Sequence, residues 1–599
     1  TNTYLYNFHL CGFHHTIKNK IIFMMKKSGI LLSLILVAVA VVALYLVVGK
    51  KANSKELRII YPFKEALFPP EFPAPTFQWR NVTGNPSISW EVTLATGNKK
   101  HIIKDITQTT TWTPSEASWD SLKLLSDHGK IFFTINIPGN SKPYDKRSFS
   151  VSRDSVGAPI LYRQLTIPFY IAEKELDSMN YILIDPGSKD QPHLAMRGFP
   201  VCGNCHSFSA DGNVMGLDLD GGRRDKGGYF LTEIKDTVMF DVNTYMSWSK
   251  LEKRSTFGSF SKLSPDGRYV ATTVKDRVVS LTPPMNTAEG FSYSLLFIPV
   301  NGHLAVYDRQ TKVVRELPGA NLPEYVQTNA FWTPDGKNII FARAKALPRD
   351  STNYYEIAVQ NKDILDKFLR REISFKFDLY TIPFNNGEGG TAVPITGASN
   401  NGKSNFFPAV SPDGKWLVYC QADEYMHLMP DSRLYIIPVE GGKPRMLDCN
   451  LFSLNSWHAW SPNSKWLVFV SKGLSYYTDM FLTHIDGKGN ASIPVLMDKA
   501  RAYKRVCNYP EFINLKADEK FVMEYDYVEL AHIRNALRER DYEKAKSLYY
   551  KLMDQDPFFF KEDYETLTDY LQRMGLPDEA RKCALLAETA LNSFAPEEE

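Results

Sequence analysis

The chain has 599 residues, with 35 glycines, 35 prolines and 13% aromatic residues. Its formal net charge of +3 is small, which argues against a nucleic-acid partner. Of its seven cysteines only Cys202 and Cys205 are close in sequence, so a disulfide-rich scaffold is excluded. The length predicts several domains, and the frequent Gly and Pro predict many short strands joined by tight turns.

Residues 1–25 show no periodic pattern, and we interpret them as a leader that takes no part in the fold. Residues 26–50 hold an unbroken apolar run from Ile30 to Val48, with a lysine pair on each side. A run of this length can span a bilayer. It therefore predicts an uncleaved signal anchor, a transmembrane helix that exports the rest of the chain; a cleaved signal peptide is the alternative.

Residues 57–152 contain short strand patterns in which apolar residues alternate with polar ones, for example in 88–94 and 131–135. Prolines between these patterns mark loops and edges. The span resembles a fibronectin type III or immunoglobulin-like β-sandwich. No catalytic constellation occurs in it.

Residues 155–527 contain an internal repeat in which a Ser-Pro-Asp-Gly turn precedes an apolar strand. Proline presets the turn, Asp bonds the backbone and Gly accepts positive φ, so each copy predicts a hairpin. The copies are Ser264-Pro-Asp-Gly267, Thr333-Pro-Asp-Gly336, Ser411-Pro-Asp-Gly414 and Ser461-Pro-Asn-Ser464, with degenerate copies at Ser209-Ala-Asp-Gly212 and Lys516-Ala-Asp-Glu519.

A second strand pair follows most of these hairpins, which gives four strands per unit. Six such units predict a mainly β protein built on a six-bladed β-propeller. The last unit lacks a clear second pair, and the strand patterns at 160–167 and 181–184 could complete it from the other end of the repeat region. Residues 345–377 have no counterpart in the other units and predict an insertion with a helix near 356–371.

From residue 528 to 594 the apolar pattern becomes helical. The run 541–557 resembles the second helix of a tetratricopeptide repeat, and Gly575-Leu-Pro-Asp-Glu-Ala580 resembles the entry to another. Such repeats are interaction modules. The alternative is a helical cap packed on the propeller, since fewer than three repeats seldom fold alone.

The sequence C-x-x-C-H, formed by Cys202, Cys205 and His206, stands just before the first turn of the repeat. This spacing suits one covalently attached haem c, with thioether bonds from both cysteines and the imidazole as proximal iron ligand. The alternatives are a disulfide, half of a zinc site, or no chemistry. Export of the chain favours haem over these.

The Ser-Pro-Asp-Gly repeats resemble those of TolB-like, WD-type propellers over some 370 residues. The run from Gly198 to Gly212 also resembles a bacterial group of such propellers that carry a cytochrome-c-type C-x-x-C-H in the first blade. This resemblance implies the propeller fold and the haem, and says little about activity.

The repeat suggests one candidate for the sixth iron ligand. His206 and His458 each lie three residues before the first residue of a turn, at Ser209 and Ser461, so both occupy the same repeat position. His458 is therefore one candidate; the alternative is that it bonds a neighbouring strand. Met215 is a second candidate, Met196 and Met426 are further rivals, and an open sixth site is also compatible with the sequence.

Two functions follow from these patterns. The first is a c-type haem protein, single-pass in the bacterial inner membrane with its bulk in the periplasm, that transfers electrons or senses a redox state. The second is a non-catalytic scaffold of the cell envelope, holding protein partners through the propeller face and the helical tail. A propeller-gated serine peptidase is excluded because no Gly-x-Ser-x-Gly elbow occurs, and no acid–base set indicates an enzyme.

Overall fold

The computed structural model describes residues 59–81, 85–99, 101–140, 142–167, 172, 178–198, 202–220, 226–282, 295–349, 356–516, 518–555 and 560–590. The predicted leader and signal anchor lie outside these residues. No helix in the described part of the chain is both long and apolar enough to cross a membrane.

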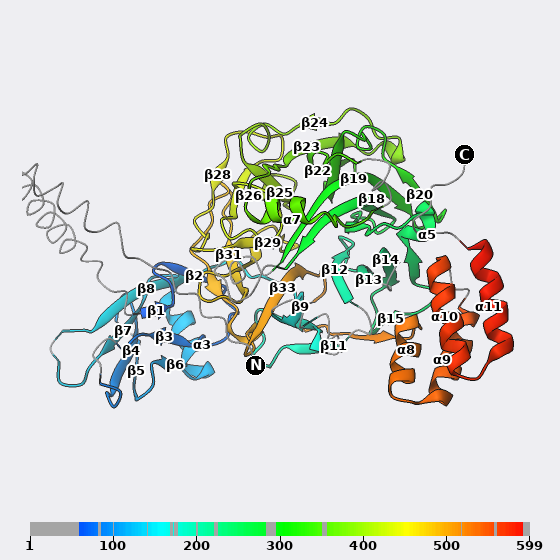
Figure 1. The fold of residues 1–599 in the computed structure, drawn as a ribbon. Coiled ribbons are helices and arrows are strands. Elements are labelled where there is room, and N and C mark those ends of the chain that lie inside the picture. The colour runs from blue at the N-terminus through cyan, green and yellow to red at the C-terminus, as the bar shows by residue number, and fades with distance from the viewer. Residues whose placement is uncertain are drawn as a thin grey trace, which may run out of the picture. The chain divides into compact units, whose positions relative to one another are not determined.

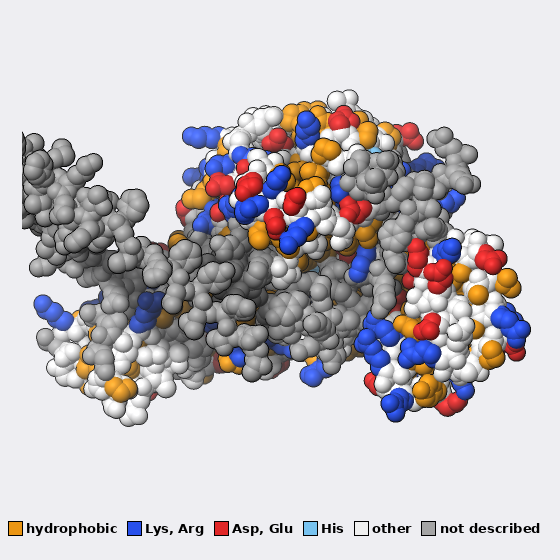
Figure 2. Space-filling model, viewed as in Figure 1, with side chains coloured by type: hydrophobic (Ala, Val, Ile, Leu, Met, Phe, Trp, Pro, Cys, Tyr) orange, Lys and Arg blue, Asp and Glu red, His pale blue; other side chains and the backbone are white. Residues whose placement is uncertain are grey.

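The chain divides into two compact units, residues 1–60 with 79–86, and residues 61–78 with 87–599. Little of the first unit falls in the described ranges, and the domains below belong to the second. On the face shown in Figure 2, basic and acidic side chains are interspersed, as the small net charge suggests.

The segment predicted as a sandwich contains two groups of strands and one helix. The five-stranded sheet has the order β2 (Ala66–Phe68), β8 (Asp145–Val151), β7 (Ile131–Asn136), β4 (Trp90–Thr96), β5 (Ile102–Thr107). Separately, β3 (Phe77–Trp79) pairs with β6 (Thr111–Trp112), and β1 (Ile59–Tyr61) begins the described chain. Alternate residues of β4 and β7 are buried, as the alternation predicts.

Helix α3 (Glu116–Ser126) was not expected in this segment. Ser115 caps its first turn, and Trp119 is fully buried, with its ring edge-on to Phe68. The Trp119 Nε1 donates a hydrogen bond of 2.8 Å to the carbonyl of Phe72. One buried tryptophan therefore fixes a helix whose apolar face is too narrow to stand out in the sequence.

Six groups of four strands follow, and they match the six predicted blades (Figure 1). From the inner strand outward they are β12 (Cys202–Phe208), β13 (Val214–Asp220), β14 (Gly228–Glu233), β16 (Tyr245–Ser247); β17 (Ser259–Leu263), β18 (Tyr269–Leu281), β19 (Leu296–Asp308), β20 (Val313–Glu316); β21 (Tyr325–Trp332), β22 (Asn338–Lys345), β23 (Asp378–Pro383), β24 (Val393–Pro394); β25 (Ser404–Val410), β26 (Trp416–Ala422), β27 (Arg433–Pro438), β28 (Arg445–Met446); β29 (Asn455–Trp460), β30 (Trp466–Ser471), β31 (Asp479–His484), β32 (Val495–Leu496); and β33 (Arg505–Phe512), β9 (Ile160–Thr166), β10 (Asn180–Ile184), β11 (His193–Arg197). The second and third groups are joined into one eight-stranded sheet by a single pair between β19 and β21.

The inner strands contact one another in the cyclic order β12, β17, β21, β25, β29, β33 and back to β12. This closed ring of radial sheets is the arrangement of a β-propeller. The ring closes where β33 pairs antiparallel with β9, which joins the two ends of the repeat region as predicted. Closure in this way gives every inner strand a neighbouring inner strand on both sides.

The repeated turns form as their residues predict. In the second blade the Ser264 hydroxyl donates to Asp266, and the Tyr269 amide donates back to the Ser264 hydroxyl at 2.8 Å. Gly267 has a φ of 67°, a conformation that glycine adopts without steric cost. The turn is thus set locally, before any contact between blades.

The last turn differs from the prediction. The strand after it, β34 (Val522–Tyr525), does not pair with β33 but runs parallel to β15 (Thr237–Phe240) beside the first blade. Because β9 already occupies that edge of β33, β34 has to find another partner. Its residues Phe521 and Met523 join the hydrophobic core of the first blade.

The helices lie where the period predicted them. The insertion contains α7 (Lys362–Leu369), and the tail contains α8 (Leu530–Arg538), α9 (Tyr542–Asp554), α10 (Lys561–Arg573) and α11 (Pro577–Thr589). The remaining helices are α5 (Trp248–Glu252) and the short 3-10 turns η2 (Asn385–Gly387) and η3 (Asp498–Ala500). The tail helices share one hydrophobic core of their own; their likeness to tetratricopeptide repeats stays a prediction.

Candidate functional site

The C-x-x-C-H run lies in β12, the inner strand of the first blade. Every inner strand contains a β-bulge, where two residues face one on the neighbouring strand. In five blades the bulge holds a left-handed residue, here called the collar: Phe260, Asn329, Phe407, Trp457 and Tyr509, with φ of 59°, 57°, 50°, 48° and 53°. Counting back from the turn, Cys205 occupies the collar position of the first blade. The bulge of this blade begins one residue before the collar position, whereas in the other blades it begins at that position.

The collar residues nearly fill the channel. Ring centroids lie 5.6 Å apart for Phe260 and Phe407, and 6.3 Å apart for Trp457 and Tyr509. His427 projects among them, 5.3 Å from the Trp457 ring. The free space that the five collar residues line is about 50 Å³, room for a few atoms only.

Cys205 is half-buried in a polar environment. Burial, and next the charge of Asp218, raises the pKa of the Cys205 thiol to about 12, against the opposing charge of Arg163. Burial also raises the pKa of Asp218 to about 8. At neutral pH the thiol is therefore protonated and a weak nucleophile, which argues against catalysis through Cys205. It forms no disulfide in the structure.

His206 and His458 form equivalent hydrogen bonds in different blades. The Nε2 of His206 lies 3.3 Å from the carbonyl oxygen of Leu161, and that of His458 lies 3.1 Å from the carbonyl oxygen of Val418. Leu161 and Val418 each lie in the second strand of the blade that precedes the blade of the histidine. The two residues occupy the same repeat position in their blades. Both imidazoles therefore donate a hydrogen bond across a blade boundary, and burial lowers their pKa to about 3 and about 4.

This arrangement does not fit a haem. Consecutive residues on a strand point to opposite sides, so Cys205 and His206 face different surroundings. His206 is only 1% exposed, its Nε2 is engaged by Leu161, and Tyr181, Phe208 and Tyr509 pack around its ring. A haem on Cys205 would need β12 to leave its place in the blade.

The other predicted ligands are not brought together. Met215 lies in the hydrophobic core of the first blade, and His458 is held in the fifth. The side chain of Cys202 lies outside the description. Within the described ranges, no group of three or more His, Cys, Asp or Glu could hold a metal ion.

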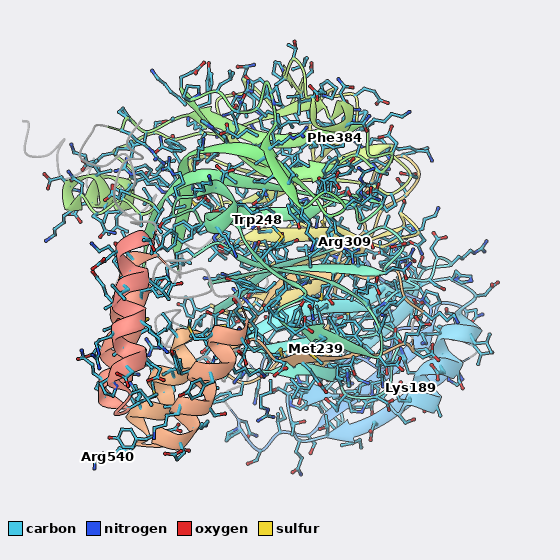
Figure 3. All side chains as sticks on the ribbon, turned by 90° about the vertical axis from the view of Figure 1, so that its right-hand side faces the viewer. Lys189, Met239, Trp248, Arg309, Phe384 and Arg540 are labelled. Atoms are coloured by element: carbon cyan, nitrogen blue, oxygen red, sulfur yellow. The ribbon has the colours of Figure 1, made fainter. Side chains whose placement is uncertain are left out.

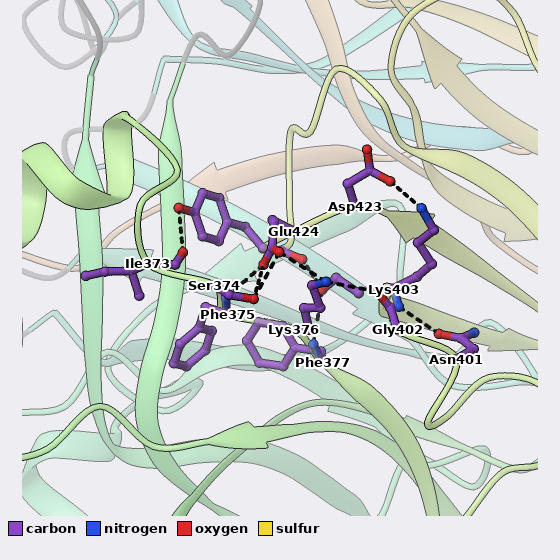
Figure 4. A network of polar contacts seen from close by, with 12 residues as sticks. Ile373, Ser374, Phe375, Lys376, Phe377, Asn401, Gly402, Lys403, Asp423 and Glu424 are labelled. Atoms are coloured by element: carbon purple, nitrogen blue, oxygen red, sulfur yellow. Dashed lines mark hydrogen bonds and ion pairs between the residues drawn. The ribbon is translucent and has the colours of Figure 1, made fainter.

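The loop that carries His427, residues 423–429, is anchored firmly at its base (Figure 4). Glu424 accepts hydrogen bonds from the hydroxyl of Ser374 at 3.0 Å and forms an ion pair with Lys376 at 3.1 Å. These contacts tie the loop to the end of the insertion, a segment without counterpart in the other blades. The insertion therefore helps to position His427 over the collar.

A second hollow lies on the outer part of the first blade. It has a volume of about 800 Å³, and Met239 and Arg309, labelled in Figure 3, are among its lining residues. Lys235 and Arg309 both approach Glu233 there, at 2.9 Å and 3.9 Å.

Three large aromatic side chains are exposed on adjoining loops. Phe452, Tyr476 and Tyr503 are 88%, 64% and 86% exposed. Neighbouring strands of a blade are antiparallel, so the loops that carry these three residues lie at the same edge of the propeller. At this edge the inner strands begin and His427 enters the channel. Backbone hydrogen bonds join these loops, from Lys472 to Ser453 at 3.2 Å and from Cys507 to Thr478 at 3.0 Å. We call the three residues the aromatic edge.

Sequence reasoning found Cys205, His206 and His458 but not the collar or the aromatic edge. The collar could have been found, because aligning the repeat on its turns places Phe260, Phe407 and Trp457 in one column. The aromatic edge carries no such signal, since exposure of a loop residue depends on the packing around it.

No protein-family model and no curated protein matches the sequence. Among solved structures, TolB from Acinetobacter baumannii is 13% identical, with a TM-score of 0.37, over 64% of this chain and 79% of that chain. A putative TolB from Agrobacterium tumefaciens is 14% identical, with a TM-score of 0.31, over 60% and 99%. The periplasmic gluconolactonase of Pseudomonas aeruginosa is 12% identical, with a TM-score of 0.30, over 56% and 81%. The propeller described above rests on the cyclic order of the six sheets.

Proposed function

We propose that this is a non-catalytic binding protein of the cell envelope, whose propeller engages a protein partner at the aromatic edge. The observation that carries the proposal is the exposure of Phe452, Tyr476 and Tyr503 on adjoining loops. Aromatic residues anchor protein interfaces, and exposed clusters of them mark such surfaces. The filled channel and the protonated Cys205 thiol offer no competing catalytic centre.

Residues 26–50 would anchor the chain in the inner membrane, with the propeller in the periplasm. The helical tail would supply a second contact for protein partners. Both statements rest on the apolar run and the helical pattern of the sequence.

Site-specific photo-crosslinking in the native host tests this proposal. A photoreactive residue at Phe452 should give a discrete crosslinked species, and the same residue at Lys337, on the turns of the opposite edge, should not. Replacing Tyr476 and Tyr503 by Ser should abolish the Phe452 crosslink while the circular dichroism spectrum stays unchanged. Equal crosslinking from both edges, or none from Phe452, would exclude the aromatic edge as an interface.

Covalent haem remains the competing proposal, and the spacing of Cys202, Cys205 and His206 is what favours it. It is tested by an absorption spectrum and a haem stain of the denatured protein, produced in a host that matures c-type cytochromes. We expect a colourless protein, since the β12 arrangement does not fit the group. A stain that survives denaturation and is lost in Cys205→Ala would establish haem and overturn the non-redox assignment.

A further inference from the structure

Arg163 of β9 places a positive charge beside the channel without a matching negative one. Its Nη1 donates to the carbonyl of Gly203 and, at 3.1 Å, to the side-chain oxygen of Asn204. Its Nε is buried and has no hydrogen-bond partner. Among the described residues no carboxylate forms an ion pair with Arg163. Arg163 is half-buried, and a charged group whose Nε is shielded from water without a partner is stabilised when an anion accompanies it.

Two further buried nitrogens, one on Trp457 and one on His427, lack partners. Trp457 is 7% exposed, and its Nε1, which can only donate, has no acceptor. The Nδ1 of His427 is buried without a partner, and its ring lies 5.3 Å from that of Trp457. The charge of Arg163 contributes, after burial, to lowering the pKa of His427 to about 3, which is consistent with their proximity. In a native structure, unsatisfied buried groups need an explanation.

The charges around the channel leave room for one anion. Lys262 and Glu511 form an ion pair and neutralise each other. Asp218, whose pKa burial raises to about 8, is largely uncharged at neutral pH. Arg163 is then the charge left without a counter-ion.

We propose that the channel mouth binds a carboxylate between the guanidinium of Arg163, the indole N–H of Trp457 and the imidazole of His427. A carboxylate is planar and acceptor-only when ionised, and it forms strong charge-assisted hydrogen bonds with a guanidinium. The group belongs either to a small free acid or to the carboxyl terminus of a peptide that enters through the loops. This site is separate from the aromatic edge.

Calorimetric titration of the full-length chain in detergent tests the site. The probes are acetate, succinate, tetra-alanine with a free carboxyl terminus, and tetra-alanine amide, each at matched ionic strength with chloride as reference. We expect saturable binding of a free-carboxyl probe and none of the amide. Binding of acetate or succinate as tight as that of the peptide identifies a small acid, whereas peptide-only binding identifies a chain terminus.

Variants make the test specific. Arg163→Gln removes the charge and should weaken binding about tenfold or more, because charge-assisted hydrogen bonds are lost. Trp457→Phe keeps an aromatic side chain, removes the N–H donor and should weaken binding about threefold to tenfold. Arg309→Gln, in the separate hollow of the first blade, should leave binding unchanged and serves as the control.

The proposal is wrong if no probe binds the wild type more tightly than chloride does, or if Trp457→Phe and Arg163→Gln bind as the wild type does. Should Arg163→Gln not fold, Arg163→Lys replaces it, since it keeps the charge without the planar fork and should bind with intermediate affinity. If the aromatic-edge crosslink is absent while carboxylate binding persists, the proposed function fails and this site does not.

Discussion

At the residue scale, one repeat position accounts for the two histidines that the sequence singled out. His206 and His458 each donate a hydrogen bond to the carbonyl of the preceding blade, at Leu161 and Val418. Blades of a propeller meet mainly through apolar side chains, and a buried imidazole adds a directional contact between them. The alternative role foreseen for His458, a bond to a neighbouring strand, is what the structure shows.

Replacing His458 by Ala should therefore destabilise the protein. The carbonyl of Val418 would lose its side-chain donor inside the blade boundary, at a cost of about 1–3 kcal/mol in the free energy of unfolding. Chemical denaturation of His458→Ala at pH 7 measures this, with the exposed His128→Ala as the control. Equal midpoints for the two variants would show that the blade-to-blade bond contributes nothing.

The same variant has a predictable dependence on pH. Burial lowers the pKa of folded His458 to about 4, whereas an unfolded histidine titrates near about 6.5. Between these values the unfolded chain binds more protons, so acid destabilises the wild type. The His458→Ala variant lacks this term, and its deficit relative to the wild type should shrink as the pH falls from 7 to 5. A deficit that stays constant across pH 5, 6 and 7 would contradict a buried neutral imidazole.

Alignment of the turns predicted that His206 and His458 are equivalent, and that part of the site was readable from sequence. What the position faces was not readable, because it depends on the bulge that separates Ser456 from Ala459 and its counterpart in β12. A bulge reverses the side of the sheet to which the later residues point. No residue type in β12 predicts that a bulge forms there. The C-x-x-C-H run itself lies in strand β12, across this bulge.

At the element scale, the segment that carries His427 depends on an insertion found in one blade only. The irregular chain between β26 and β27 gains its order from Glu424 and from Tyr425, whose hydroxyl donates to the carbonyls of Phe368 and Ile373 at 2.9 Å and 3.0 Å. The sequence predicted the insertion and its helix. That the insertion anchors the segment carrying His427 follows only from these contacts, which join residues about 50 positions apart in the chain.

Removing the Glu424 carboxylate should loosen the loop without unfolding the blade. Glu424→Ala deletes the acceptor of Ser374 and Phe375 and the ion-pair partner of Lys376, a change of about 1–2 kcal/mol for a partly exposed group. Hydrogen exchange should become faster in residues 423–429 and stay unchanged in β26. The exposed Glu388→Ala serves as control, and exchange in 423–429 equal to that control would show that the anchor is not needed.

At the scale of the whole molecule, the fold is a ring whose last inner strand returns to the first strands of the repeat. β33 pairs with β9, and β34 then crosses to β15, so the closing segment contacts both the last and the first blade. The repeat count and the closure could be predicted because turn chemistry is local and written in each copy. The parallel β34–β15 pair could not, since nothing in a four-residue strand specifies a partner almost 300 residues away.

This closure predicts how the chain tolerates shortening. A chain ending at Tyr527 loses only helices with a core of their own and keeps Tyr527 stacked on Tyr245 at 4.2 Å, so its thermal midpoint should change little. A chain ending at Leu515 loses the buried Phe521 and Met523, each a deletion of about 2–5 kcal/mol, and should unfold at a clearly lower temperature. A chain ending at Ala502 also lacks β33, which leaves β9 without its inner partner strand and β29 without a neighbouring inner strand, and it should not unfold cooperatively. Calorimetry of the three chains in parallel measures this order, and a chain ending at Ala502 as stable as the one ending at Tyr527 would contradict closure of the ring by β33.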